Sequence, residues 1–452
     1  MATVPYLFGI AHPTGFPAFV FIGYLFTHLI PIGSIAWRAT LVACAGGAAA
    51  SFAVWLTLSA LEAPPCIAML SAWIFAFGDI VWSRSTRTDV HALELGFEAL
   101  ALACAVVYVR NKSKRYLFLA TTFFGFALAT HPNALWVGPG LLVMVLWGAR
   151  RIDARSIAIA IATCAAPLLL YLYMLPRSLW LSRNAVDPTL AIGVPPGQPF
   201  WNYGDPSTIR GFIWMITGQQ WNTHPILGEM LWPSTYAHGF AFFFTNAVTE
   251  FGWLLLAVAG LGFLALCFDT PAVAALLGIS LVTVSGFANA YTIENDQARY
   301  LLSALWIASV FIGFAFTAMS RVKGLHLAAI TLAAIAFAWT LWSNHGLLHT
   351  RTDPGASKYI ARVRESTGGN DVIVAGWTYV TPLGYAKYVE HSLNGRIPVN
   401  AEPPQAIALA EKLAATHQTD LVLEKPVTVP GYRLIPLDMG FPHFYRLARV
   451  IR

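Results

Sequence analysis

Charged residues are scarce in this sequence. Asp, Glu, Lys and Arg make up 11% of the 452 residues, whereas hydrophobic residues make up 57%. Soluble domains carry roughly 25% charged residues, so this composition excludes an ordinary soluble protein and indicates a polytopic membrane protein. The formal net charge of +6 comes from short basic clusters between apolar runs. This distribution is typical of membrane loops and argues against nucleic-acid binding.

Motifs for thiolate metal sites, disulfides and nucleotides are also missing. The five cysteines lie in or at the edges of apolar runs, and no two of them form a CxxC pair. We therefore interpret them as small buried hydrophobic residues. The polar C-terminal region contains neither GxGxxG nor a P-loop, so nothing in it supports nucleotide binding.

Apolar runs that can cross a ~30 Å hydrocarbon core, or nearly so, occur about ten times. Each of them predicts a transmembrane helix, and together they predict a polytopic α-helical domain over residues 38–349. The ten runs are residues 38–60, 66–82, 92–109, 116–130, 133–147, 156–175, 251–268, 271–289, 299–319 and 325–342.

Basic residues in the short loops predict the orientation. Loops 110–115, 150–155 and 321–323 fall on one side if ten spans alternate, and their Lys and Arg residues make that side cytoplasmic. The long loop 176–250 and the tail 350–452 then face outward. Ten is an even number, so Met1 is also expected outside, and we expect a further span to be encoded upstream of it.

Residues 1–37 are interpreted as part of a first outer loop. The segment 13–37 is apolar but is interrupted by Pro17, Gly23, His28, Pro31 and Gly33. These residues weaken a membrane helix, so two short interfacial helices are favoured over one continuous span.

Charged residues gather in WSRSTRTDVHALE, residues 82–94, just beyond the outer end of a span. They either line a polar cavity or form a solvated loop in which Thr88 or Asp89 caps the next helix. Asp89 is favoured over Glu94 as a functional acid, because residues five apart need not share a helix face. His131 ends another outward span before Pro132, and its role is either structural or catalytic.

The outer loop contains WNYGDPSTIRGFIWMITGQQWNTHP, residues 201–225. Asp205 before Pro206 predicts the cap of an amphipathic helix that covers a cavity and acts as a lid over substrate. The residues assigned to this lid are Asn202, Asp205, Trp214 and Gln219.

A second charged group lies just outside the start of a late span, in YTIENDQARYLLSAL. Arg299 is suited to hold a phosphate by bidentate contacts, or it pairs with Asp296 one helical turn earlier. From residue 350 the composition becomes that of a soluble domain. Alternating helices and strands predict a small α/β domain of about one hundred residues.

These groups suit an anionic substrate linked to a lipid. Glycosyl transfer needs a carboxylate to take the acceptor's proton and cations to stabilise the departing phosphate. Arg87 and Arg299 supply the cations, and Asp89, Glu294 and Asp296 are the candidate acids. The alternatives are a transporter or flippase for a lipid-linked substrate, or a catalytically inactive relative. We find no internal repeat of the kind that transporters carry.

Four segments of the chain resemble the protein O-mannosyltransferase-like family. The first two, GIAHPTGFP and LIPIGSIAWRATL, are similar to the family patterns GIAHPPGYP and LLPIGNPAWRVNL. The other two, NYGDPSTIRGFIWMITGQQW and NDQARYLLSAL, resemble a loop segment and a late arginine-tyrosine segment of the family. The resemblance implies a GT-C fold that transfers sugar from a polyprenyl-phosphate donor to a protein, glycan or lipid acceptor at the outer membrane face. It implies an integral protein of the bacterial plasma membrane. Divalent metal dependence stays open, because GT-C enzymes differ in it.

Residue roles follow from the resemblance. The usual base of such enzymes is an acid in the first outer loop, but residues 1–7 contain none, and we expect it upstream of Met1. Asp89 matches the position of a second acid, while His12 and His131 match histidines of the family. Arg87, Arg299 and Tyr300 are assigned to the donor phosphate.

Overall fold

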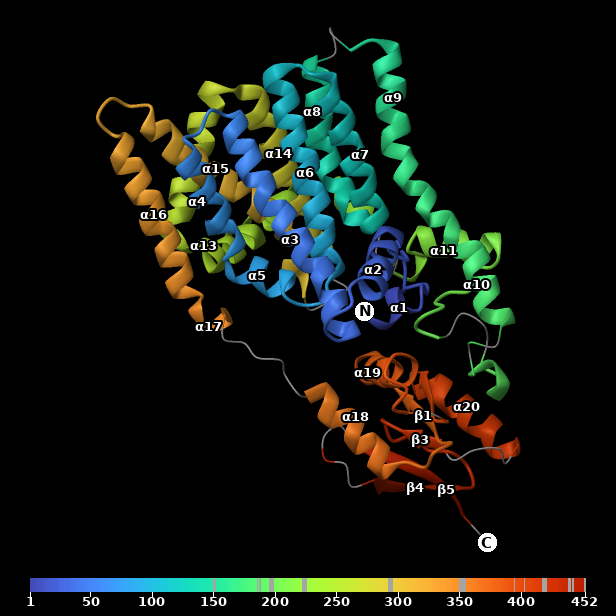
Figure 1. The fold of residues 1–452 in the computed structure, drawn as a ribbon. Helices are drawn as coiled ribbons and strands as arrows, with labels where there is room; N and C mark the ends of the chain where they lie inside the picture. The colour runs from blue at the N-terminus through green and yellow to red at the C-terminus, as the bar shows by residue number, and fades with distance from the viewer. Residues whose placement is uncertain are drawn as a thin grey trace.

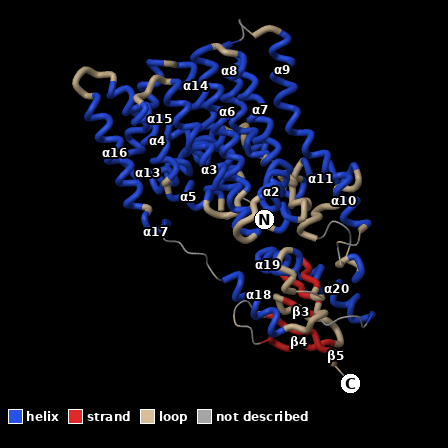
Figure 2. The backbone as a smooth tube through the Cα atoms, viewed as in Figure 1, coloured by secondary structure: helices blue, strands red, loops and turns tan. Residues whose placement is uncertain are grey.

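The computed structural model describes residues 1–148, 152–184, 186, 188–194, 199–221, 226–291, 296–348, 355–393, 395–401, 403–416, 421–437, 440 and 443–450. A helical bundle stands over a small C-terminal domain (Figure 1). All five described strands belong to that domain, as the red segments in Figure 2 show. The predicted fold class, a polytopic helical membrane protein with a small α/β domain, is confirmed.

All ten apolar runs form helices, and the described residues include seven helices long and apolar enough to cross a membrane. A bent pair, α4 (Pro65–Ala76) and α5 (Asp79–Ser85), makes an eighth span if its two parts are counted together. The seven are α3 (Ile35–Ala60), α6 (Val90–Asn111), Ala154–Arg183, α13 (Pro233–Asp269), α14 (Pro271–Ala290), Gln297–Ser320 and α16 (His326–Ser343).

By length, the described residues contain seven or eight candidate spans, against about ten expected. The helix α7 (Lys114–Thr130) has only 17 residues, and the next apolar helix, Pro132–Trp147, is also short. Pro132 has no backbone N–H to continue α7, so the chain changes there to a 3-10 turn, η1 (Pro132–Val137), before α8 (Gly138–Gly148). Proline divides two apolar runs that hydropathy alone counts as two full spans.

The N-terminal segment contains one apolar helix where two were expected. After the short α1 (Thr3–Tyr6), α2 runs over Pro17–Leu29, and α3 begins at Ile35. Gly23 lies inside α2 and does not break it, whereas Gly33, with a φ of 73°, lies in the turn before α3. The 13 residues of α2 are too few to span a bilayer.

Three ion pairs join the basic loops at the end of the bundle away from the C-terminal domain. Arg110 contacts Glu62 at 2.6 Å, Lys114 contacts Asp153 at 3.0 Å, and Arg321 contacts Asp269 at 2.7 Å. Arg110 also donates to the Thr270 hydroxyl at 3.3 Å, and Arg321 donates to the Leu61 carbonyl at 2.6 Å. The loops that join α3 to α4, α6 to α7 and α13 to α14 therefore meet at one end. This arrangement is the one that the alternation of spans predicts for the basic loops.

The segment 176–250 is more helical than expected. A long helical stretch formed by α9 (Ala154–Ala165), η3 (Ala166–Tyr173) and α10 (Met174–Arg183) leads into it, and α13 already begins at Pro233. Between them lie η4 (Leu190–Ile192), α11 (Ile209–Ile216), η5 (Gln219–Trp221) and α12 (Ile226–Glu229). The helix α13 is kinked at Gly252, whose φ of 74° an L-residue rarely adopts.

The C-terminal domain is a mixed five-stranded sheet covered by helices. Its strand order is β2-β1-β3-β5-β4, with β1 parallel to β2 and β3, and β5 antiparallel to β3 and β4. Strand β2 contains Pro398. The elements are α18 (Gly355–Ser366), β1 (Val372–Ala375), α19 (Trp377–Tyr388), β2 (Ile397–Asn400), α20 (Pro403–Thr416), β3 (Leu421–Leu423), β4 (Tyr432–Leu437) and β5 (Phe444–Arg449).

The helix α19 joins this domain to the bundle. The Tyr385 hydroxyl accepts a hydrogen bond from the backbone N–H of Ala36 at 3.1 Å, and the rings of Tyr388 and Trp201 lie 4.3 Å apart. Trp377, the first residue of α19, therefore faces the end of the bundle where the charged sequence segments lie.

Candidate active site

A cavity of about 660 Å³ lies where the bundle meets α19. This volume is in the range of small-molecule sites, roughly 300–1,000 Å³. The wall combines apolar side chains, among them Leu135, Trp136 and Phe287, with a group of polar and charged ones. The polar and charged members include His12, Arg84, Arg87, Asp89, His91, His131, Asn133 and Arg299.

Two sequence motifs that are far apart meet below this cavity. Ile10 and Asn202 form a parallel β-bridge, in which Ile10 N–H donates to the Trp201 carbonyl at 2.6 Å. A Cβ atom on Gly9 would overlap that carbonyl, so only glycine permits the close approach. Tyr173 donates its hydroxyl proton to the Gly9 carbonyl at 2.8 Å, which fixes the motif from the other side. The GIAHP segment is thus held rigidly, and it presents His12 to the cavity.

His12 is neutral at physiological pH. Its burial lowers the pKa of the imidazole to about 4. Its ring lies against Phe16 and against Trp377 of α19, with centroid distances of 4.9 and 5.8 Å.

The titration of His12 predicts a loss of stability in acid. In the unfolded chain the histidine binds a proton below about pH 6.5, whereas in the folded protein it does so only below about pH 4. The free energy of unfolding therefore decreases as the pH drops from about 6.5 to 4, and it is retained above this window. At pH 5.5 the loss is about 1 kcal/mol. Denaturation in detergent at pH 7.5 and 5.5 should therefore show a smaller acid-induced loss in His12→Asn than in the wild type. Equal losses in the two proteins would contradict this assignment.

An acid–arginine network forms one side of the cavity. Asp89 caps α6 by accepting the His91 backbone N–H at 2.9 Å, and its other oxygen lies 3.3 Å from Arg84 Nη1 and 3.4 Å from Arg87 Nε. Asp296 also pairs with both arginines. The capping role and the cavity position, considered as alternatives for Asp89, are therefore both observed. Arg84 is buried, whereas half of the Arg87 side chain is exposed.

The helix that carries Arg84 is fixed from below by Glu250. This carboxylate is 3% exposed and accepts the backbone N–H groups of Ile80 at 2.6 Å and Val81 at 3.3 Å. Such N–H groups at a helix N-terminus have no partner within the helix, and a carboxylate there stabilises it. Glu250 precedes the kink at Gly252, so the shape of α13 sets the position of α5 and its arginine.

Arg299 and Tyr300 also line the cavity, from η6 (Gln297–Leu301). The Arg299 guanidinium lies 5.2 Å from the centre of the Tyr300 ring. The Tyr300 ring in turn contacts His91 at a centroid distance of 5.0 Å. Arg299, Tyr300 and Arg87, the three residues assigned to phosphate from the sequence, therefore line one cavity, together with Arg84.

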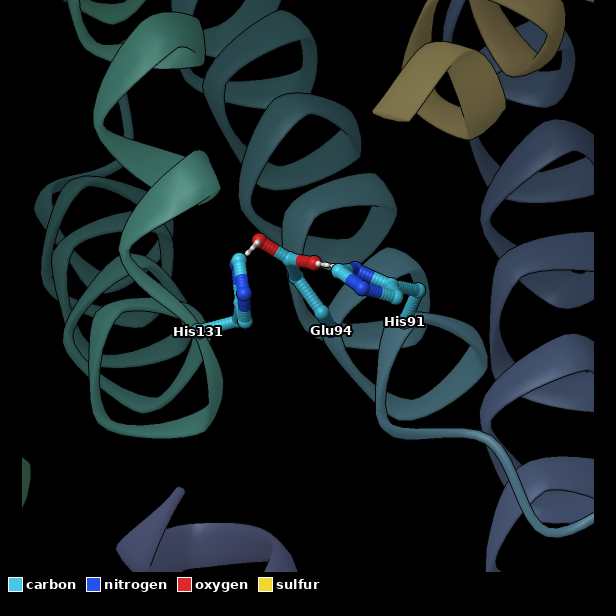
Figure 3. Close-up of side chains that lie close together, drawn as sticks. All are labelled: His91, Glu94 and His131. Atoms are coloured by element: carbon cyan, nitrogen blue, oxygen red, sulfur yellow. Dashed lines mark hydrogen bonds and ion pairs between the residues drawn. The ribbon is translucent and has the colours of Figure 1, made fainter. Parts of the chain in front are cut away.

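Two histidines that line the cavity, His91 and His131, lie beside the buried Glu94, and Figure 3 shows both imidazoles pointing at its carboxylate. His91 Nδ1 is 2.8 Å from Glu94 Oε2, and His131 Nδ1 is 3.6 Å from Glu94 Oε1. Their ligand atoms all lie within 4.8 Å of one another, a spacing that can hold a metal ion. His131 ends α7 and accepts the Asn133 backbone N–H at 3.2 Å, so the helix break at Pro132 positions it.

The lid residues chosen from the sequence lie near the cavity but do not line it. The described lining takes Ile216, Thr217 and Gly218 from the end of α11, rather than Asn202, Asp205, Trp214 or Gln219. The cap of α11 is Thr208, whose hydroxyl accepts the Gly211 N–H at 3.0 Å, and not Asp205 as expected. Asp205 has a φ of 44° and accepts from the Ser207 hydroxyl instead. Glu294, one of the candidate acids, lies outside the described residues.

Sequence reasoning passed over four residues of this region. Arg84 and His91 were seen in the charged segment but not selected, and Glu94 was ranked below Asp89. The i,i+3 spacing of His91 and Glu94 at the start of α6, which puts them on one helix face, could have revealed the pair. Trp377 carries no local signal, because it reaches the cavity only through the packing of the C-terminal domain.

Comparison with known proteins identifies relatives of this chain. Residues 1–154, which contain the GIAHP segment, α5 and the histidine–glutamate group, match the family described as Protein O-mannosyl-transferase TMEM260 N-terminal domain. The chain is similar to the TMEM260 family. The resemblance drawn from GIAHPTGFP and its companion motifs is confirmed.

Two curated TMEM260 proteins can be aligned with the chain. "Protein O-mannosyl-transferase tmem260" of Dictyostelium discoideum is 24% identical over 290 residues, 58% of this chain and 32% of that protein. The Mus musculus TMEM260 is 25% identical over 234 residues, 49% of this chain and 30% of that protein. The aligned region is thus about a third of the length of these relatives.

Solved structures with a similar fold include ArnT from Cupriavidus metallidurans. In the form bound to undecaprenyl phosphate, its TM-score is 0.56 at 11% identity, over 98% of this chain and 88% of ArnT. The apo form gives a TM-score of 0.52 at 12% identity over the same shares. The TMEM260-like chain therefore has the ArnT type of GT-C fold, which agrees with the predicted fold.

Proposed function

We propose that this chain is a GT-C glycosyltransferase that moves a sugar from a polyprenyl-phosphate donor to a protein, glycan or lipid acceptor at the outer membrane face. The single observation that carries the proposal is that Arg84, Arg87 and Arg299 line one cavity. Arginine is the residue best suited to hold a phosphate through two parallel hydrogen bonds. The similarity to TMEM260 and the ArnT-like fold support the same class of reaction.

In the proposed reaction, binding of the donor phosphate breaks contacts in the acid–arginine network. Without a phosphate, Arg84 and Arg87 pair with Asp89 and Asp296. A phosphate in the cavity competes for the same guanidinium groups, and their departure leaves an oxygen of Asp89 available. Asp89 is the sole carboxylate among the described lining residues, so it is the proposed base for the acceptor hydroxyl. The cations stabilise the negative charge on the leaving lipid phosphate.

Apolar side chains give the lipid a place beside the arginines. Leu135 and Leu227 are 52% and 71% exposed and line the same cavity. A polyprenyl tail can lie along this surface while its phosphate meets the charged wall, because the tail avoids water and the phosphate avoids hydrocarbon. The basic loops, which follow the positive-inside rule, lie at the other end of the bundle, so this end is the outer one.

Trp377 is proposed to contact the transferred sugar or the acceptor. It is 38% exposed, lines the cavity, and is braced by His12 and by Tyr203, whose ring centre is 5.9 Å away. Trp377→Ala is expected to raise KM roughly tenfold with a smaller change in kcat, because an exposed aromatic surface contributes about 1 kcal/mol or more to binding. Trp377→Phe should recover part of the loss. Steady-state kinetics in which kcat falls and KM does not change would contradict a binding role.

Incubation with labelled polyprenyl-phosphate sugars tests the function itself. The full chain, reconstituted in vesicles, is mixed with donors carrying different sugars and with peptide, glycan and lipid acceptors, and the labelled product is isolated. Transfer of label to an acceptor supports the enzyme. Movement of intact donor across the bilayer without transfer would instead identify a flippase. If no donor is either transferred or moved, the chain is an inactive relative.

A further inference from the structure

Glu94 is a carboxyl group buried in the bundle beside two histidines. Its side chain is 2% exposed, and its Oε2 oxygen lies 2.8 Å from His91 Nδ1, while Oε1 lies 3.6 Å from His131 Nδ1 and has no hydrogen bond of normal geometry. Arg84 and Arg87, which precede α6, contact Asp89 and Asp296 instead. A buried carboxylate is costly unless it is paired, and a cation held here would offset that cost.

A second buried carboxylate one helical turn further on strengthens this requirement. Glu98 is 1% exposed, and the Ser303 hydroxyl donates to its Oε2 oxygen, while its Oε1 oxygen has no hydrogen bond. Residues four apart on a helix are neighbours, and two like charges at this spacing repel each other. A cation at Glu94 would offset both the burial and the repulsion.

The side chains around Glu94 are donors that suit a transition metal. His91 precedes Glu94 by three residues on α6, and His131 approaches from the end of α7, so two helices supply the group. Each histidine directs Nδ1 toward a different oxygen of the carboxylate, at 2.8 and 3.6 Å. Two imidazoles and one carboxylate form a typical three-ligand zinc site, in which a fourth position stays open for water or substrate.

We propose that His91, Glu94 and His131 bind one divalent transition-metal ion of the zinc type. Imidazole nitrogen selects zinc and its neighbours in the periodic table over magnesium or calcium, which prefer oxygen ligands alone. Both histidines also line the arginine cavity, whereas Glu94 lies behind them. The open position of the metal therefore faces the cavity. If the proposed function holds, this position takes an oxygen of the donor phosphate, and the metal adds to the charge that Arg84 and Arg299 supply.

Metal binding is tested without donor or acceptor. The full chain in detergent is stripped with a chelator, dialysed and titrated with Zn²⁺ by calorimetry, and with Co²⁺ by the visible absorption of its tetrahedral complexes. One equivalent is expected to bind to the wild type. Glu94→Gln and His131→Gln are each expected to weaken binding by roughly 100-fold or more.

The matched control is Glu98→Gln, which removes the other buried carboxylate of α6 but none of the three ligands. It should weaken binding by less than roughly tenfold, because it removes a neighbouring charge but no ligand. Thermal melting of the apo proteins identifies any variant that fails to fold, and the two ligand variants lie on different helices, so one remains informative if the other fails. Absence of binding by the wild type, or wild-type affinity in a folded Glu94→Gln, would overturn the proposal.

These experiments distinguish failure of the metal site from failure of the proposed function. A wild-type protein that binds one Zn²⁺ through these residues but transfers no sugar would support the metal site and contradict the proposed function. A wild-type protein that transfers sugar but binds no metal would support the proposed function and contradict the metal site.

Discussion

Replacing Arg299 by alanine is expected to lower sugar transfer by roughly 10²- to 10³-fold. The guanidinium lines the same cavity as Arg84 and Arg87, so the three groups together form the proposed phosphate site. Its loss removes charge stabilisation where negative charge develops on the departing phosphate. Arg299→Lys should be intermediate, because an ammonium group keeps the charge but not the two parallel hydrogen bonds. Initial rates with a defined donor and acceptor measure the effect.

The control for charge alone is Arg110→Ala. Arg110 pairs with Glu62 at the other end of the bundle, where the pair is largely exposed and contributes about 1 kcal/mol or less to stability. This variant should transfer sugar at the wild-type rate. Wild-type activity in Arg299→Ala would remove Arg299 from the phosphate site, and equal losses in the two variants would point to a general effect on the protein.

Replacing Gly46 by valine is expected to destabilise the bundle by about 3 kcal/mol or more. A Cβ atom at Gly46 would overlap the carbonyl oxygen of Ala92, and one at Gly96 would lie 2.8 Å from the Gly46 carbonyl oxygen. The helices α3 and α6 thus touch backbone to backbone, as small residues allow in membrane helix pairs. Backbone cannot move aside as a flexible side chain can. Because α6 carries Asp89, His91 and Glu94, separation of the helices should also disturb the site.

Gly260→Ala is the matched control for Gly46→Val. Gly260 lies in α13, and a Cβ atom there would meet nothing within 4 Å. The substitution should be neutral or stabilise the helix by up to about 1 kcal/mol, because alanine has the higher helix propensity. Unfolding in detergent, followed by fluorescence-detected size exclusion after heating, compares the two. A Gly46→Val protein as stable as the wild type would contradict the close packing of α3 and α6.

The helical architecture could be predicted from sequence, because hydrophobic runs follow directly from the need to face lipid or a packed interior. All ten runs are helical, and the alternation of helices and strands expected after residue 350 is present in the C-terminal domain. The division at Pro132, between the runs 116–130 and 133–147, was also expected from sequence. The bend of 71° between α4 and α5, at Phe77 and Gly78 inside the run 66–82, was not. Such breaks depend on neighbouring helices as much as on the run itself.

Site residues could be predicted where a single charged or titratable residue stands out in an apolar sequence. They could not be predicted where contacts between distant segments bring them to the cavity. His12, Asp89, Arg87 and Arg299 stood out as polar groups at the ends of apolar runs, and all line the cavity. Glu94 was undervalued because its distance from Asp89 was considered, and not its spacing from His91. The role of Glu250 under α5, and the position of Trp377 above His12, come from contacts between distant segments that no local pattern encodes.

The central claim is that the three-arginine cavity binds the phosphate of a lipid donor. An experimental structure of the full chain with a polyprenyl phosphate tests it most directly. We expect the phosphate within hydrogen-bonding distance of Arg84, Arg87 and Arg299, with the lipid chain along Leu135 and Leu227 and with at least one of the contacts between Asp89 and the arginines broken. A phosphate bound elsewhere, for example at the basic loops around Arg110 and Arg321, with the pairs of Asp89 intact, would contradict the account.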